Sequence, residues 1–182
     1  MSLEEKNPTA RQRRETILQL LRQISDGGAI SASALAAKLG VSRQIVVGDI
    51  ALLRASGEEI LATPRGYLLE NTDNGGLRRT IACKHHSGDA MARELYAIVD
   101  NGGEVLDVIV EHPVYGQISG ALKLRSRYDV TAFLEKVERY RAQPLSALTD
   151  GIHLHTVFCR DEETFLRITQ ALQEQGILLE RG

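Results

Sequence analysis

The residues best suited to metal chemistry in this chain are its histidines, and all five lie between residues 85 and 155. His153 and His155 are two apart in a stretch that predicts a β-strand, so both side chains face the same side of a sheet. His86 stands where an earlier predicted strand ends, and Glu94 follows in a predicted helix. Three imidazoles and one carboxylate form a suitable ligand set for a borderline divalent metal. Zn²⁺ would take all four ligands tetrahedrally, whereas Ni²⁺, Fe²⁺, Mn²⁺ or Co²⁺ would keep further positions open.

Spacing alone leaves a second interpretation of these residues open. A His-x-His pair in a strand is more often an ordinary half-buried pattern than a metal site, and Glu94 would then be a solvated helix residue. His85 and His86 are adjacent and point opposite ways in an extended chain, so at most one of them joins His153 and His155. His112, directly before Pro113, is either a further ligand or a turn residue.

The elements that would position these residues follow the pattern of an α+β domain. Their order is strand, helix, two strands, helix, strand, helix and strand. This order predicts helices packed on one face of a mainly antiparallel sheet. Apolar spacing predicts strands over 80–85, 105–110, 117–124, 153–159 and 177–180, and helices over 89–99, 126–141 and 161–175.

The N-terminal part of the chain shows a different pattern. Helical spacing covers 11–24, 31–39 and 42–55, and Gly40 separates the second helix from the third. Two short strands follow, over 60–62 and 67–69. A helix-turn-helix followed by a small hairpin is a winged helix.

The third helix of this module carries residue types that read DNA. Ser42, Arg43 and Gln44 lie at its N-terminus, the end that enters the major groove in such modules. Arginine can bond guanine and glutamine can bond adenine, while Ser42 and free backbone N–H groups can hold a phosphate. Arg65, at the tip of the hairpin, could contact phosphate or the minor groove. Sequence-independent attraction would come from the arginines of the first helix, Arg11, Arg13 and Arg14.

Two alternatives remain for this module. The arginines could form a solvated helix face with Ser42 as a simple cap, and some winged helices dock proteins rather than DNA.

Composition supports two globular modules. The 182 residues are 43% hydrophobic and 25% charged, which is typical of folded proteins. Residues 6–66 carry nine Lys/Arg against five Asp/Glu, whereas residues 80–182 carry eleven against fifteen. A polar stretch at 71–76 separates a basic module from an acidic one, so we expect domains over 1–72 and 73–182.

Several protein classes are excluded by the sequence. An apolar run of the roughly 20 residues that a membrane helix needs does not occur, and the start of the chain has no apolar secretion core, so we expect a cytoplasmic protein. Cys83 and Cys159 lack the paired spacing of a zinc motif and form no disulfide framework.

Specific motifs in both modules carry a resemblance to a known family. The segments 41–47, 49–54 and 62–68 resemble the winged-helix module that also opens bifunctional biotin ligase repressors. The segments 108–116, 144–145 and 150–156 resemble the three-histidine (3H) regulatory domain. Together, over almost the full length, they resemble the NiaR-type nicotinate-responsive transcriptional repressors.

This resemblance implies a metal-dependent repressor and not an enzyme. It implies one divalent metal, with nickel and zinc as the first candidates. The metal would be bound by the residues that match the family pattern, which are His86, Glu94, His153 and His155. It implies nicotinic acid as the effector, which we expect to act as a corepressor for genes of NAD biosynthesis and niacin uptake. We also expect the protein to bind operator DNA as a homodimer, because one winged helix makes few specific contacts and a two-fold protein matches a two-fold operator. His112 and Tyr115 are our candidates for contacts with the effector. The alternative is a metal-dependent hydrolase fused to a winged-helix module, and a third interpretation is a protein-docking module with a structural metal.

Overall fold

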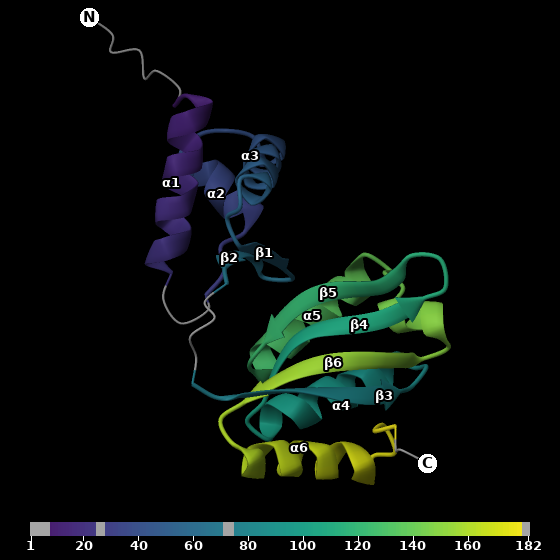
Figure 1. Ribbon diagram of the computed structural model, residues 1–182. Coiled ribbons are helices and arrows are strands. Elements are labelled where there is room, and N and C mark those ends of the chain that lie inside the picture. The colour runs from purple at the N-terminus through teal and green to yellow at the C-terminus, as the bar shows by residue number, and fades with distance from the viewer. Residues whose placement is uncertain (1–7, 25–27, 71–74, 180–182) are drawn as a thin grey trace, which may run out of the picture. The chain divides into compact units, whose positions relative to one another are not determined.

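The structure is a computed structural model that describes residues 8–24, 28–70 and 75–179 (Figure 1). The chain divides into two compact units, Met1–Asp73 and Asn74–Gly182. The expected boundary between residues 72 and 73 falls outside the described residues.

The N-terminal unit contains three helices and a hairpin, and polar caps start each helix. Thr9 and Gln12 form a capping box at the first helix, and Ser31 and Ser42 each accept a backbone N–H at the start of the next two. Gly40 ends the second helix in the left-handed conformation, with φ 66°. The elements are α1 (Ala10–Gln23), α2 (Ala32–Leu39), α3 (Arg43–Ala55), β1 (Ile60–Thr63) and β2 (Gly66–Leu69).

One small core holds these elements together. The inward face of α1 supplies Ile17 and Leu21, and α3 supplies Val46 and Ile50, all almost completely buried. The hairpin closes against the helices through a bridge between Tyr67 and Ile30, whose backbone groups exchange two hydrogen bonds of 2.9 Å. The expected helix-turn-helix with a hairpin wing is therefore present.

The C-terminal unit is a four-stranded antiparallel sheet in the order β3-β6-β4-β5, with helices on one face (Figure 1). Side chains of the strands and helices share a single buried cluster on that face. The strands are β3 (Leu77–Lys84), β4 (Glu104–His112), β5 (Gly116–Leu124) and β6 (Ile152–Cys159). The helices are α4 (Gly88–Asp100), α5 (Arg127–Arg139), α6 (Glu162–Glu174) and the short 3-10 helix η1 (Leu145–Thr149).

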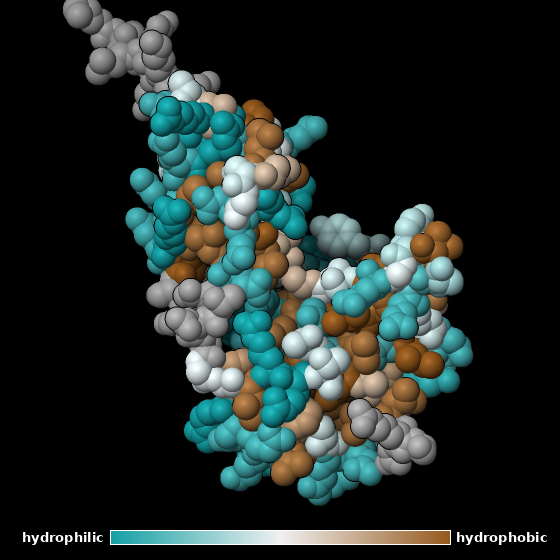
Figure 2. Space-filling view, viewed as in Figure 1, coloured by the Kyte–Doolittle hydropathy of each residue, from teal (hydrophilic) through white to brown (hydrophobic). Residues whose placement is uncertain are grey.

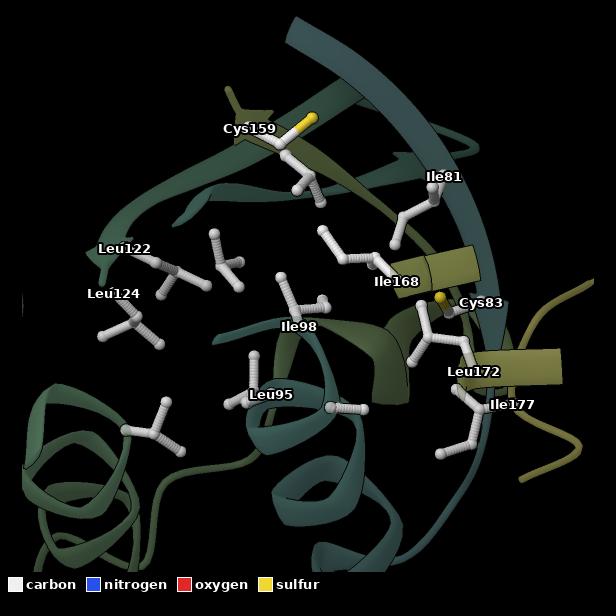
Figure 3. Packing of buried hydrophobic residues seen from close by; sticks show 14 residues of the cluster. Ile81, Cys83, Leu95, Ile98, Leu122, Leu124, Cys159, Ile168, Leu172 and Ile177 are labelled. Atoms are coloured by element: carbon white, nitrogen blue, oxygen red, sulfur yellow. The ribbon is translucent and has the colours of Figure 1, made fainter. Parts of the chain in front are cut away.

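The two faces of this sheet differ in character. Figure 3 shows the buried face, where Leu95 and Ile98 of α4 meet Ile168 and Leu172 of α6 among inward strand residues. The opposite face carries half-buried residues such as Leu154, and hydrophobic side chains lie there among hydrophilic ones (Figure 2). The helices therefore bury only one side of the sheet, as expected for the α+β class.

The end of the chain differs from the expectation of a final strand over 177–180. Leu178 forms an isolated bridge with Cys83 of β3. Lys84 donates its N–H to the Ile177 carbonyl, and Leu179 donates to the Ala82 carbonyl. The segment therefore borders β3 through a few backbone bonds and is too short to count as a strand, while residue 180 lies outside the described residues.

Candidate metal centre

The sheet register sets the three histidines beside one another. On β3 and β6, Cys83 pairs with His153 and Ile81 pairs with His155, and paired residues share a face of the sheet. Alternation continues this row to His85, whose N–H bonds the Gly151 carbonyl. A side chain at Gly151, where φ is 81°, would collide with the backbone of His85. Glycine at this position therefore permits the close approach of the two chain segments.

Glu94 of α4 lies at the centre of these histidines and is completely buried. Its carboxylate oxygens lie 2.6 Å from His85 Nε2, 3.1 Å from His153 Nε2 and 3.5 Å from His155 Nε2. The His153 ring packs edge-on against the His85 and His155 rings, with centroid distances of 4.8 and 4.9 Å. One carboxylate thus faces three imidazole nitrogens in a water-poor site.

The outer nitrogens of the strand histidines are held by backbone carbonyls. His153 Nδ1 bonds the Gly151 carbonyl at 2.9 Å, and His155 Nδ1 bonds the Asp107 carbonyl. A carbonyl can only accept, so Nδ1 carries the hydrogen in both rings. In their neutral form both rings therefore turn the Nε2 lone pair toward the carboxylate.

This donor set fits a divalent cation. Lone pairs of neutral imidazoles repel a carboxylate unless a proton or a metal ion lies between them. Backbone-anchored Nδ1–H groups are also the usual support of metal-binding histidines. His85, Glu94, His153 and His155 are therefore suited to hold one borderline metal ion.

The ionisation of the site follows from burial and pairing. Burial opposes the charge on Glu94, but the His155 charge and hydrogen bonds from His153, His155 and His85 hold its pKa well below the usual value. Burial likewise opposes the charged form of His155, yet the Glu94 carboxylate raises its pKa. The positive charge of His155 thus stabilises the buried Glu94 carboxylate, and a bound cation could take over this role.

His86, which the sequence-based expectation named as a ligand, does not lie in this group. Its side chain is 61% exposed, and its Nδ1 lies 3.9 Å from the Asp150 carboxylate. His85 takes its place because it continues the inward alternation of Ile81 and Cys83. That alternation was visible in the sequence and would have identified His85.

An apolar cavity of about 230 Å³ opens beside the histidines. Met91 of α4, Leu122 of β5 and Phe133 of α5 line it, while His85, Gln143 and Ser146 add polar groups. A neighbouring cavity of about 420 Å³ shares His85, Gln143 and Ser146 with it. His85 Nδ1 is buried without a hydrogen-bond partner among the described residues. The site can therefore take a small ligand with an apolar ring and a polar end.

The expected effector contacts lie elsewhere. His112 and Tyr115 belong to the end of the β4–β5 hairpin, and Tyr115 is 78% exposed. His112 Nδ1 accepts the backbone N–H groups of Val114 and Tyr115, and the two rings lie 5.0 Å apart. In the described part of the chain neither residue lines the two cavities.

The residues that we expect to read DNA lie at the start of α3 and in the hairpin of the N-terminal unit. Ser42 caps this helix by accepting the Ile45 N–H at 3.3 Å, and Arg43 and Gln44 are exposed beside it. Arg65 lies in the turn between β1 and β2. This is the expected arrangement of helix and wing.

Two of the arginines expected to attract DNA form ion pairs inside the N-terminal unit. Arg13 Nε lies 2.8 Å from the Asp49 carboxylate, and Arg14 lies 3.4 Å from it. Arg11 is exposed and pairs with Glu15. Of the three, Arg11 is the residue whose side chain faces solvent.

Comparison with known proteins matches both units. An HTH domain matches residues 13–68, and a 3H domain matches residues 78–181. The probable transcription repressor NiaR of Thermotoga maritima is 43% identical, over 96% of this chain and 98% of that protein. The chain belongs to the NiaR-type repressor family.

A second relative, the transcription repressor NadR of Bacillus subtilis, is 39% identical over 92% of this chain and 93% of its own length. The expectation that the chain is not an enzyme is confirmed by this family membership, and the hydrolase alternative is set aside. Among the described residues, the helices are too short or too polar to cross a membrane.

Proposed function

We propose that this protein represses genes of NAD biosynthesis and niacin uptake, with nicotinic acid as its corepressor and one divalent metal in its C-terminal unit. The observation that carries the proposal is the buried group of one carboxylate and three histidines that opens onto an apolar cavity. The family membership supports the repressor role.

The N-terminal unit reads the operator in this proposal. Arg43 and Gln44 contact base edges from the start of α3, and Ser42 with the neighbouring N–H groups contacts a phosphate. Arg65 reaches the phosphates or the minor groove from the hairpin. One such module makes few specific contacts, so we propose a homodimer on a two-fold operator.

The C-terminal unit senses the vitamin in this proposal. His85, Glu94, His153 and His155 hold Ni²⁺ or Zn²⁺, with Fe²⁺, Mn²⁺ or Co²⁺ as other candidates. The metal, when bound, supplies a Lewis-acid anchor for the pyridine nitrogen or the carboxylate of nicotinic acid. The apolar cavity walls cover the ring, and His85, Gln143 and Ser146 offer hydrogen bonds to its polar end. Nicotinic acid acts as a corepressor only if it binds the DNA-competent arrangement more tightly than the other.

Operator binding tests this proposal directly. Fluorescence anisotropy would follow the protein on a labelled duplex from the promoter of such a gene, with and without nicotinic acid. We expect nicotinic acid to tighten binding of the metal-loaded protein and to have no effect after chelation. An operator affinity that nicotinic acid leaves unchanged in the presence of metal would contradict the corepressor role.

A variant pair tests the DNA-reading residues in the same assay. Arg43→Ala should cost about 1–3 kcal/mol of specific binding, because a base contact is lost. Arg11→Ala is the matched control, an exposed arginine outside α3, and should weaken specific and non-specific DNA binding equally. Equal effects of the two variants on specificity would argue against the assignment of Arg43.

A further inference from the structure

We propose that Cys83 is an additional ligand of the metal centre, a soft donor that favours Zn²⁺, Ni²⁺ and Co²⁺ over Mn²⁺. This inference rests on the proposed metal site and adds to it a residue outside the histidine and glutamate set.

The position of Cys83 is fixed by the same register that aligns the histidines. It lies directly opposite His153 on β3 and between Ile81 and His85 in the inward row. The Cys83 sulfur, a Glu94 carboxylate oxygen and a His153 ring nitrogen all lie within 4.8 Å of one another. All three residues are buried, and among the described residues this is the one such group of three potential ligands that meets this distance.

Glu94 and His153 therefore belong to two overlapping ligand sets. One set contains His85 and His155 on the cavity side, and the other contains Cys83 on the side of the apolar core. Figure 3 shows Cys83 beside Leu172 and Ile177, away from solvent. A metal ion near Glu94 and His153 thus has a sulfur within reach on its closed side, while the cavity side stays accessible to an effector.

Cys159 is a useful comparison for Cys83, because it is a cysteine that only packs in the core. Cys159 is also buried and inward-facing, but it pairs with Leu77 at the other end of the same two strands. Its thiol donates to the Asp161 carbonyl at 3.5 Å. Among the described residues, Cys83 is the one cysteine that lies near both a carboxylate and an imidazole.

The chemistry of ligation is a proton displacement without a redox change. The divalent metal bonds the Cys83 sulfur, the S–H bond breaks, and the proton leaves to solvent. Metal-bound thiols are deprotonated outright, even where burial alone favours the neutral form. Thiolate is a soft ligand that Zn²⁺, Co²⁺ and Ni²⁺ accept more readily than Mn²⁺, which suits oxygen donors.

Cobalt substitution tests the assignment. The full-length, chelator-treated protein would be loaded with Co²⁺, with metal analysis for stoichiometry and near-ultraviolet absorption as the readout. We expect a thiolate-to-cobalt charge-transfer band in the wild type and in Cys159→Ser, and its loss in Cys83→Ser. Competition between Zn²⁺ and Mn²⁺ should show the Zn²⁺ preference of Cys83→Ser reduced about 10-fold.

Each outcome separates this inference from the proposed function. Cobalt bound stoichiometrically without the charge-transfer band, or with a band that survives in Cys83→Ser, would overturn the role of Cys83 and leave the metal site standing. A wild type that binds no cobalt, nickel or zinc would overturn both. Circular dichroism of Cys83→Ser and Cys83→Ala controls for folding.

Discussion

Each unit of this protein buries a carboxylate among basic side chains, but the two arrangements differ in kind. In the N-terminal unit, Asp49 of α3 is 4% exposed and lies between Arg13 and Arg14 of α1. In the C-terminal unit, Glu94 of α4 is completely buried among three histidines. The local problem is the same, since a buried negative charge must be compensated.

The chemistry of the partners decides what each carboxylate can do. A guanidinium is always charged and offers no lone pair, so the Asp49 pair can only hold α3 against α1. An imidazole titrates near neutral pH and can bind a metal, so the partners of Glu94 can change. The first cluster fixes α3, the helix that we propose reads DNA, and the second can respond to a ligand.

The largest expected effect comes from removing the responsive carboxylate. Glu94→Gln should weaken metal binding at least about 100-fold, the upper end of the range for groups that merely support a metal ligand. Isothermal titration with Ni²⁺ and Zn²⁺ measures it, with Glu111→Gln as an exposed control from β4. Unchanged affinity in Glu94→Gln would remove this residue from the metal centre.

The corresponding change in the N-terminal unit should affect stability instead. Asp49→Asn leaves Arg13 in a largely buried position with the Pro8 carbonyl but without its carboxylate partner. The variant should lower the free energy of unfolding by about 2 kcal/mol, between the values for exposed and fully buried pairs. Urea denaturation followed by circular dichroism measures this loss. Metal affinity should stay the same, and a change there would show that the two clusters are coupled.

The different outcomes for these sites show what periodicity can and cannot predict. Caps and apolar spacing predicted α2, α3, the hairpin and the shared face of His153 and His155, because these are local properties. Whether His85 or His86 faces the buried side depends on which alternate residues of β3 point that way. The apolar residues Ile81 and Cys83 indicate that His85 does. The pairing of Arg13 and Arg14 with Asp49 joins residues more than 30 positions apart, and no local pattern of charges indicates it.

A smaller, pH-dependent effect should separate the two clusters further. His155 has a raised pKa in the folded chain, so its pairing with Glu94 stabilises the metal-free protein fully below the ordinary value of about 6.5. This contribution is lost as the pH rises through the raised pKa. The difference in unfolding free energy between wild type and His155→Gln, measured with chelator present, should therefore shrink from about pH 6 toward pH 9. A difference that grows with pH would contradict this assignment.

The smallest effect is expected at the exposed histidine. His86→Gln should change metal affinity less than about threefold, because its ring lies outside the Glu94 cluster, whereas His85→Gln should lower the affinity at least about 10-fold. Titration with Zn²⁺ compares the two variants. The opposite ranking would restore His86 as the ligand.

The alternation along β3 has an evolutionary consequence. Because successive residues face opposite sides of a sheet, a one-residue insertion or deletion within β3 would reverse the facing of the residues on one side of the change relative to those on the other side. The C-terminal unit can thus tolerate amino-acid replacements at many strand positions but not a change in strand length. Among descendants of this gene, loss of the cluster of histidines around Glu94 should arise more readily from small insertions or deletions here than from most single substitutions.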